Sequence, residues 1–197
     1  MPFRGPAYRR SRGPVRPSRG RAVMTESDTR PVVVMLCTGN AARSVMATIV
    51  GRARTDAVRF VGAGTHSIEG LPMSGRTRRA LESLGLADGS HRSHQLTAAD
   101  ARGADLIVAF APEHVDYVRR VHPEAAARTA TIKRLVDELP PGPDPLNQRV
   151  DSLNLADAEV PWGEEVVDPG GFDEDIFIAC AREIDSLMDR LIPLLQS

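Results

Sequence analysis

Short apolar runs alternate with helix-like stripes along most of this 197-residue chain, and this alternation limits the folds open to it. Short apolar runs are typical of buried strands, whereas apolar residues at three- to four-residue spacing indicate helices. Strands that alternate with helices form a parallel sheet with helices packed on both faces. We therefore expect a three-layer α/β sandwich around a four-stranded parallel sheet. The expected strands are residues 32–36, 58–61, 105–110 and 129–132, and the expected helices are residues 45–54, 75–84, 113–121 and 173–191.

The composition is typical of a globular protein that spans no membrane. Hydrophobic residues make up 42% of the chain and charged residues 26%, and the length allows one domain with a sizeable core. No stretch approaches the ~18 to 20 consecutive apolar residues that a transmembrane helix needs. The two cysteines, Cys37 and Cys180, are too few for a disulfide scaffold and lack zinc-site spacing. We therefore expect a cytoplasmic protein, with Cys180 as a core thiol of the last helix.

The first 23 residues differ from the rest of the chain. They contain seven arginines and no acidic residue, together with four prolines and three glycines. Removing those seven positive charges from the net charge of −1 leaves −8 for the remainder. Such a segment buries too little apolar surface to offset its ordering entropy, so we predict a disordered tail over residues 1–30 and one domain over residues 31–197. The tail has three interpretations: a solvated extension, a weak non-specific anion binder, or translated sequence upstream of a start at Met24.

The segment VVVMLCTGNAARSVMA, residues 32–47, joins an expected buried strand to an expected helix through a short loop. Such a loop directs backbone N–H groups and the positive end of the helix toward one point, which suits an anion. The same groups and Arg43 favour the anionic form of Cys37. Ser44 can add a hydroxyl hydrogen bond to that sulfur, and Arg43 can grip two oxygens of a tetrahedral anion. The segment predicts an anion site, and a core cysteine at a strand end is the alternative.

Asp168 is a second candidate, in the sequence VVDPGG just before the last expected helix. Pro169 biases Asp168 away from helical backbone angles, so its carboxyl is expected on an extended loop. The alternative is an aspartate that caps the start of the helix. The residues alone leave both open.

The CTGNAARS loop, the DPGG segment and the intermediate segments GAGTHSIEGLPM, HRSHQL and ADLIVAFAPEH together resemble the low-molecular-weight protein tyrosine phosphatase family. The likeness runs over residues 31–195, and its motifs stand in the family's order. The family signature is CxGNxCRSP, and its acid loop reads DPYG. The resemblance implies a protein tyrosine phosphatase that hydrolyses a phosphate ester in two steps without a metal or cofactor.

The resemblance also implies a role for each motif residue. Cys37 would be the nucleophile that forms a cysteinyl phosphate, and Asp168 would protonate the leaving group and then activate water. Arg43 would hold the equatorial phosphate oxygens, Asn40 would fix the loop, and Ser44 would assist the thiolate. The phosphate-binding loop would comprise Thr38, Gly39, Asn40, Ala41, Ala42, Arg43 and Ser44.

Three positions bear on how far the resemblance extends. Ala42 stands where the family has a second cysteine, so no neighbouring thiol can trap an oxidised Cys37 as a disulfide. Gly170 replaces the family's tyrosine beside the acid, which removes an aromatic wall for the substrate ring. Trp162 is the candidate to supply that wall instead.

Two other functions compete with the phosphatase. An arsenate reductase, or another small-thiol-dependent transferase, could use the same loop, although the missing resolving cysteine excludes an internal thiol route. A catalytically silent phosphopeptide-binding module would need no acid, so Asp168 argues against it. The implied substrate is a phosphotyrosine protein or an aryl phosphate, with a cognate tyrosine kinase as a candidate partner. Neither nucleic acid nor a membrane is expected as a partner.

The histidines are expected to be structural. His91 and His94 have a three-residue spacing found in some metal sites, but no cysteine or carboxylate cluster in the sequence completes a ligand set, so no metal is expected. His66, His114 and His122 are expected at loop or helix surfaces.

Overall fold

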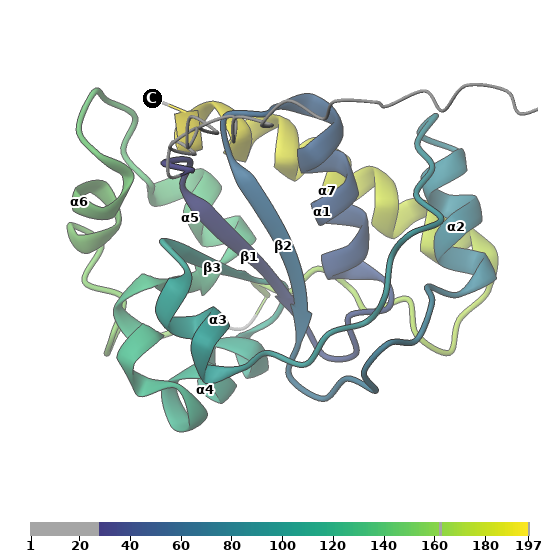
Figure 1. Ribbon diagram of the computed structural model, residues 1–197, viewed down its shortest axis with the longest axis horizontal. Helices are drawn as coiled ribbons and strands as arrows, with labels where there is room; N and C mark the ends of the chain where they lie inside the picture. The colour runs from purple at the N-terminus through teal and green to yellow at the C-terminus, as the bar shows by residue number, and fades with distance from the viewer. Residues whose placement is uncertain (1–27, 162, 197) are drawn as a thin grey trace, which may run out of the picture.

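Four parallel strands form the centre of the computed structural model, which describes residues 28–161 and 163–196 (Figure 1). The strands are β1 (Val32–Cys37), β2 (Arg59–Gly64), β3 (Leu106–Ala109) and β4 (Thr129–Thr131). They lie in the order β2-β1-β3-β4, and each neighbouring pair runs parallel. The predicted four-stranded parallel sheet is confirmed.

Strand β1 lies inside the sheet and is covered on both of its faces. Its side chains alternate between two apolar layers, with Val33 and Met35 in one layer and Val34 and Leu36 in the other. A parallel strand with both faces covered needs a continuous apolar run rather than an alternating one. This requirement explains the run VVVMLC that ends at Cys37.

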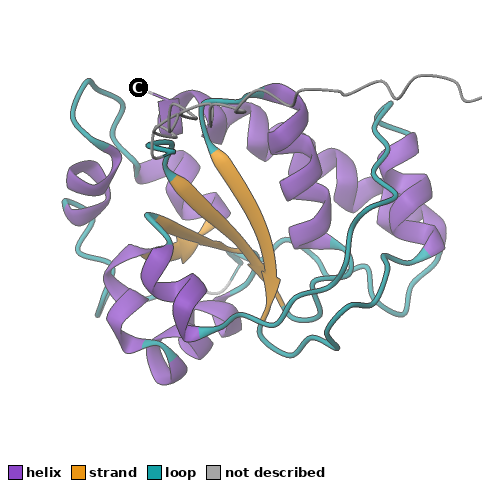
Figure 2. Ribbon diagram, in the orientation of Figure 1, coloured by secondary structure: helices purple, strands orange, loops and turns teal. Residues whose placement is uncertain are grey.

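One face of the sheet is covered by a first set of helices. Helices α1 (Arg43–Arg54) and α7 (Glu174–Gln196) bury their apolar stripes against the layer that contains Val33. Helices α2 (Gly75–Glu82) and α5 (Ile132–Glu138) both contact α7. Figure 2 shows the sheet, in orange, between this set of helices and a second one.

The second set of helices covers the opposite face. Helices α3 (Ala98–Gly103) and α4 (Pro112–Val121) and the 3₁₀ helix η1 (Pro123–Arg128) supply the apolar side chains that pack on Val34. Helix α6 (Leu146–Asp151) contacts η1, but its buried Leu146 and Val150 belong to the layer that contains Val33. The predicted three-layer α/β sandwich is therefore confirmed.

Local differences from the prediction have identifiable causes. The helices α3, α5 and α6 were not predicted, because six or seven residues are too few for a helical periodicity to be recognised. Strand β2 begins one residue later than predicted and continues to Gly64, through the sequence VGAG. Glycines are typical of loops, but the ladder with β1 extends to the pair Cys37–Gly64.

Two predictions concern residues that the structure does not describe. Nearly all of the predicted tail falls within residues 1–27, and Trp162 is also outside the described residues. The tail, its boundary at residue 30 and the role of Trp162 stay predictions. Within the described ranges, no helix has the length and apolar character needed to cross a membrane.

Candidate active site

The loop that leads from β1 to α1 forms the base of the site, at the carboxyl end of the sheet. Strand β1 ends at Cys37, and α1 begins six residues later at Arg43. Asn40 lies between them with φ of 47°, in the left-handed region that asparagine tolerates better than most residues. This residue reverses the chain within a very short loop.

The carbonyl groups of this loop are held from outside. Each of four carbonyl oxygens accepts a hydrogen bond from a neighbouring segment, and this orientation turns the loop N–H groups toward the inside of the curve. The first turn of α1 adds further N–H groups, because its N-cap Ala42 makes no side-chain capping bond. The four bonds are Thr65 N to Cys37 O (2.9 Å), His66 N to Thr38 O (2.8 Å), Ser93 Oγ to Asn40 O (2.9 Å) and Thr77 Oγ1 to Ala41 O (2.8 Å).

The sulfur of Cys37 lies at the bottom of this curve. Its Sγ is 2.9 Å from the Oγ of Ser44, and the Nδ2 of Asn40 donates to that same Oγ at 2.9 Å. Cys37 is 3% exposed and lines the pocket at this site.

Arg43 connects the loop to the segment that precedes α7. Its Nη2 donates to the Oδ2 of Asp168 at 2.6 Å, and its Nη1 donates to the carbonyl of Val166 at 3.1 Å. The guanidinium is buried, whereas the Asp168 side chain is 52% exposed and so faces incoming ligands. Gly170 N donates to the other oxygen of Asp168 at 2.9 Å. The carboxyl is therefore held at both of its oxygens.

These residues enclose a pocket of about 370 Å³. The loop forms its floor, α2 and α7 form its walls, and Asp168 stands at its edge. Most of the lining side chains are small, so little in the wall would exclude a broad substrate. The lining residues are Cys37, Thr38, Gly39, Ala41, Ala42, Arg43, Ser74, Thr77, Asp168, Gly170 and Phe177.

Comparison with known proteins decides the family. Residues 32–160 match the family model of the low molecular weight phosphotyrosine protein phosphatases. The chain belongs to this family. Asp168 lies beyond the matched residues, and its placement rests on the structure alone.

Related proteins in this family carry two different specificities in their names. A protein-arginine-phosphatase from Geobacillus stearothermophilus is 27% identical over 84% of this chain and 96% of its own length. The low molecular weight protein-tyrosine-phosphatase Etp from Escherichia coli K12 is 28% identical over 61% of this chain and 81% of its own length. A crystal structure of a low molecular weight protein tyrosine phosphatase from T. tengcongensis is 29% identical, with a TM-score of 0.66 over 82% of this chain and 97% of that one.

The phosphatase-family residues predicted from the sequence all lie at one pocket or support it. Cys37, Arg43 and Asp168 line it together, and Ser44 and Asn40 lie behind the sulfur. Their catalytic roles stay predictions. Gly170 stands where the family's acid loop has a tyrosine. A Cβ placed on Gly170 would lie only 3.2 Å from the Oδ1 of Asp168. Glycine therefore suits the orientation that Asp168 has here.

Nothing in the sequence indicated the residues that support the loop from outside. Thr77 and Ser93 are ordinary polar residues until the fold brings them to the loop carbonyls. The expected surface position of two histidines was wrong, since His114 and His122 are buried. The Nε2 of His114 lies 3.0 Å from the Oγ1 of Thr38 in the loop. An apolar stripe around His114 on α4 was the only hint of its burial.

Proposed function

We propose that this protein is a cysteine-dependent phosphatase, a phosphoric monoester hydrolase that removes phosphate from protein phosphotyrosine or from small aryl phosphates. The observation that carries this proposal is the contact of Asp168 with Arg43, which lie 125 residues apart in the chain. It brings a carboxyl group to the edge of a pocket that has a cysteine at its base. An anion-binding module would need the loop but not the carboxyl.

In the first step Cys37 would attack phosphorus as the thiolate, so that the S–P bond forms while the bond to the leaving oxygen breaks. The loop N–H groups and Arg43 stabilise the three equatorial oxygens in the transition state. Arg43 has five N–H donors, of which Asp168 and Val166 engage two, so it can also bind phosphate. Asp168 donates its proton to the leaving oxygen.

The charge of the substrate supports this role for Asp168. In the free protein the carboxylate is paired with the Arg43 guanidinium. A phosphate dianion competes for the same guanidinium, which frees the Asp168 carboxyl to act on the leaving oxygen. In the second step Asp168 accepts a proton from water, water attacks phosphorus, and the S–P bond breaks to release Cys37 as a thiolate. Ser44 would stabilise that thiolate.

Phosphoarginine is a second candidate substrate, and a specific observation favours it. The relative named as a protein-arginine-phosphatase matches 84% of this chain, whereas the tyrosine phosphatase Etp matches 61%. In addition, Gly170 supplies no aromatic wall beside Asp168, and Phe177 is the only aromatic residue among the described residues that line the pocket. The same two steps would then cleave a P–N bond instead of a P–O bond.

The structure offers no internal thiol route for arsenate reduction. Cys180 is the only other cysteine in the chain, and it is buried in the core of α7. Burial raises the pKa of its thiol to about 12, so Cys180 stays neutral and unreactive near neutral pH. We infer a reducing, cytoplasmic location, because the two cysteines of the chain are too few for a disulfide scaffold. A cognate tyrosine kinase remains a proposed partner.

Phosphate release from four substrates tests the proposal: p-nitrophenyl phosphate and peptides that carry phosphotyrosine, phosphoarginine or phosphoserine. We expect hydrolysis of the aryl phosphate and of either the phosphotyrosine or the phosphoarginine peptide, and little hydrolysis of the phosphoserine peptide. Cys37→Ser should abolish turnover and keep phosphate affinity. Cys180→Ala is the matched control, because it removes the other thiol and should keep the activity.

Two outcomes would contradict the phosphatase assignment. Equal activity of the parent protein and Cys37→Ser would show that the thiol is not the nucleophile. Thiol-dependent arsenate reduction without hydrolysis of any phosphate substrate would favour the transferase instead.

A further inference from the structure

A short segment between α2 and α3 supports Asn40, the residue that shapes the anion loop. The Nε2 of His91 and the Oγ of Ser93 lie 3.0 and 2.9 Å from the carbonyl oxygen of Asn40. The backbone N–H of His94 donates to the side-chain Oδ1 of Asn40 at 2.9 Å. Asn40 thus keeps its left-handed backbone because segment 91–94 holds it at two oxygens.

The bond from His94 also decides which way the Asn40 amide points. A backbone N–H can only donate, so the oxygen of the amide must face His94 and its NH₂ group must face Ser44. Nδ2 then donates to the Oγ of Ser44 at 2.9 Å. The Sγ of Cys37 lies 2.9 Å from that Oγ. A thiolate sulfur can only accept, so the Ser44 hydroxyl donates to Cys37 when the sulfur is ionised. A directed set of hydrogen bonds therefore runs from the His94 backbone to the Cys37 sulfur.

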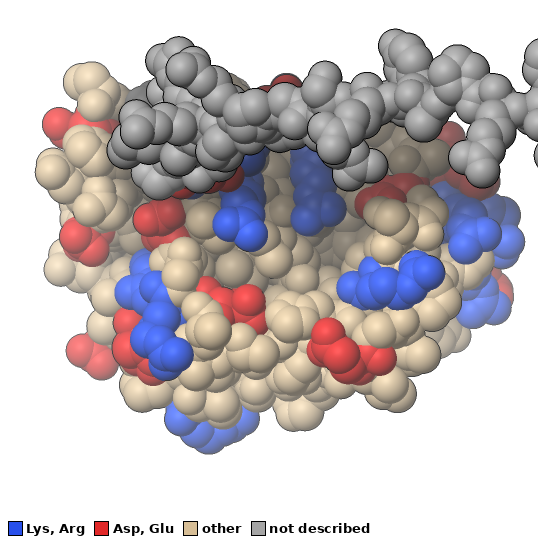
Figure 3. Space-filling model, viewed as in Figure 1, with Lys and Arg blue, Asp and Glu red and all other residues tan. Residues whose placement is uncertain are grey.

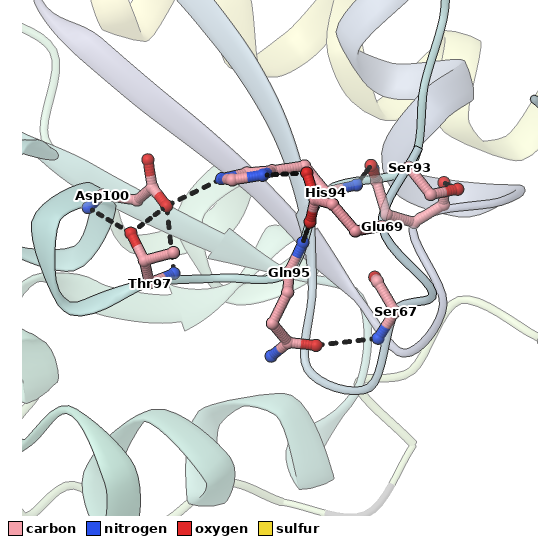
Figure 4. Close-up of polar contacts among 8 residues, drawn as sticks. Ser67, Glu69, Ser93, His94, Gln95, Thr97 and Asp100 are labelled. Atoms are coloured by element: carbon pink, nitrogen blue, oxygen red, sulfur yellow. Dashed lines mark hydrogen bonds and ion pairs between the residues drawn. The ribbon is translucent and has the colours of Figure 1, made fainter. Parts of the chain in front are cut away.

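The ring of His94 lies between two carboxylates (Figure 4). Its Nδ1 is 3.0 Å from the Oε1 of Glu69, and its Nε2 is 2.9 Å from the Oδ2 of Asp100. A carboxylate accepts hydrogen bonds, so both contacts are satisfied together only when both ring nitrogens carry a proton. The two carboxylates, Glu69 first, raise the pKa of His94 above its ordinary value of 6.5, although partial burial opposes them.

Among the residues that the structure describes, no lysine or arginine side chain contacts the ring of His94. The nearby guanidinium of Arg92 donates to the carbonyls of Ser90 and His91. His91 faces the Asn40 carbonyl, which can only accept, and burial lowers the pKa of His91. The pKa of His91 is thus lowered, whereas that of His94 is raised.

The same two carboxylates fix the backbone around His94. The second oxygen of Glu69 accepts from Gln95 N at 2.9 Å, and Asp100 accepts from Thr97 N at 3.0 Å. Glu69 belongs to the loop after β2, whereas Asp100 belongs to the first turn of α3. A charged His94 therefore joins two elements across the segment that holds Asn40. A neutral ring can donate to only one of them.

We propose that protonated His94 is a positioning residue for Cys37, which locks the Asn40 amide through its backbone N–H and thereby directs the Ser44 hydroxyl to the sulfur. Loss of the His94 proton releases one carboxylate, loosens segment 91–97 and weakens the support of the thiolate. The consequence for catalysis rests on the phosphatase function proposed above. The effect on the reactivity of the Cys37 sulfur does not depend on that function.

Alkylation of Cys37 by iodoacetamide tests this proposal without any substrate. The rate is measured from pH 5 to 8 by mass spectrometry of the Cys37 peptide. His94→Gln should slow the alkylation at pH 6 by about three- to tenfold, the equivalent of one ordinary hydrogen bond. His94→Arg keeps a permanent positive charge and several donors, so it should react within about twofold of the parent rate.

A second measurement follows the pH dependence. The turnover rate of the parent protein divided by that of His94→Arg should be constant at low pH and fall as His94 loses its proton, which NMR of the His94 ring follows directly. The Glu69→Gln variant should slow alkylation as His94→Gln does. Glu138→Gln is its matched control, because Glu138 pairs with Arg134 on α5 and should leave the rate unchanged.

Two results would overturn the proposal. In the first, folded His94→Gln is alkylated at the parent rate throughout the pH range and only its thermal stability is lowered. That result would show that His94 has a purely structural role. The other is full additivity of Asn40→Ala and His94→Gln, which would show that His94 does not act through Asn40. A protein that hydrolyses none of the four phosphate substrates would contradict the proposed function, and the alkylation result would still stand.

Discussion

Two histidines near the site, His94 and His114, differ in pKa because their immediate partners differ. His94 lies between two carboxylates, which raise its pKa. His114 is buried on α4 with only the Thr38 hydroxyl near its Nε2, and burial, followed by the charge of Arg43, lowers its pKa from 6.5 to about 3. The sequence alone shows two histidines with no sign of their different partners. Their charge states depend on contacts between elements that are distant in sequence.

The His114 environment predicts a loss of stability in acid. Between pH 6.5 and about 3 the unfolded chain binds a proton at this residue and the folded protein does not, so stability falls as the pH falls. The slope is up to ~1.4 kcal/mol per pH unit. His114→Gln should remove this slope in urea unfolding measured at pH 4, 5 and 6. An unchanged pH dependence would show that His114 is already protonated in the folded state.

The contribution of His94 to stability has the opposite sign. Its raised pKa means that the folded protein holds the proton more tightly than the unfolded chain does. Its stabilising effect is therefore complete below pH 6.5 and is lost as the pH rises through its folded-state pKa.

Among the elements, the segment from Val166 to Gly171 does most to complete the site. It is held by a backbone bond from Val166 N to the Phe110 carbonyl (2.9 Å) and by the Arg43 guanidinium. Gly171 ends the segment with φ of 85°, a conformation that glycine adopts without strain. This segment places Asp168 over the loop after β1.

Asp168→Asn tests the acid assigned to that segment. The amide keeps the size of the side chain but cannot give a proton to the leaving oxygen, so kcat/KM on phenyl phosphate, which reports the first step alone, should fall by about 10²- to 10⁴-fold. The loss on p-nitrophenyl phosphate should be smaller, because p-nitrophenolate leaves without a proton. An equal loss on both substrates would count against a proton-donor role and favour a purely structural one.

The elements also show how far the sequence predicts this fold. The run VVVMLC and the helix that follows it identified the centre of the sheet and the anion loop, because their pattern is local. The helices α3, α5 and α6 were missed because each is short. Glu69 and Asp100 could not be paired with His94, since that contact depends on how the loop after β2 lies against α3.

At the scale of the whole molecule, phosphate recognition is local. The net charge is −1 for the full chain and −8 without the seven arginines before residue 24, so overall charge does not attract an anion. Figure 3 shows acidic and basic side chains interspersed over one face of the molecule. We propose that the attraction comes from Arg43, the loop N–H groups and the start of α1.

A protein that begins at Met24 tests this local account. All of the pocket residues lie between Cys37 and Phe177, so kcat and KM for p-nitrophenyl phosphate should stay within about twofold of the full chain. A large rise in KM after removal of residues 1–23 would instead assign the arginine-rich segment a part in substrate binding.

The most direct test of the central claim is to trap the phosphoryl group on Cys37. Asp168→Asn should still be phosphorylated by p-nitrophenyl phosphate, and it should then hydrolyse slowly because no base activates water. Rapid acid quenching and peptide mass spectrometry should therefore find one added phosphoryl group on the Cys37 peptide and none on Cys180. Continued p-nitrophenol release with the Cys37 peptide unmodified, or a phosphoryl group on another residue, would contradict the account.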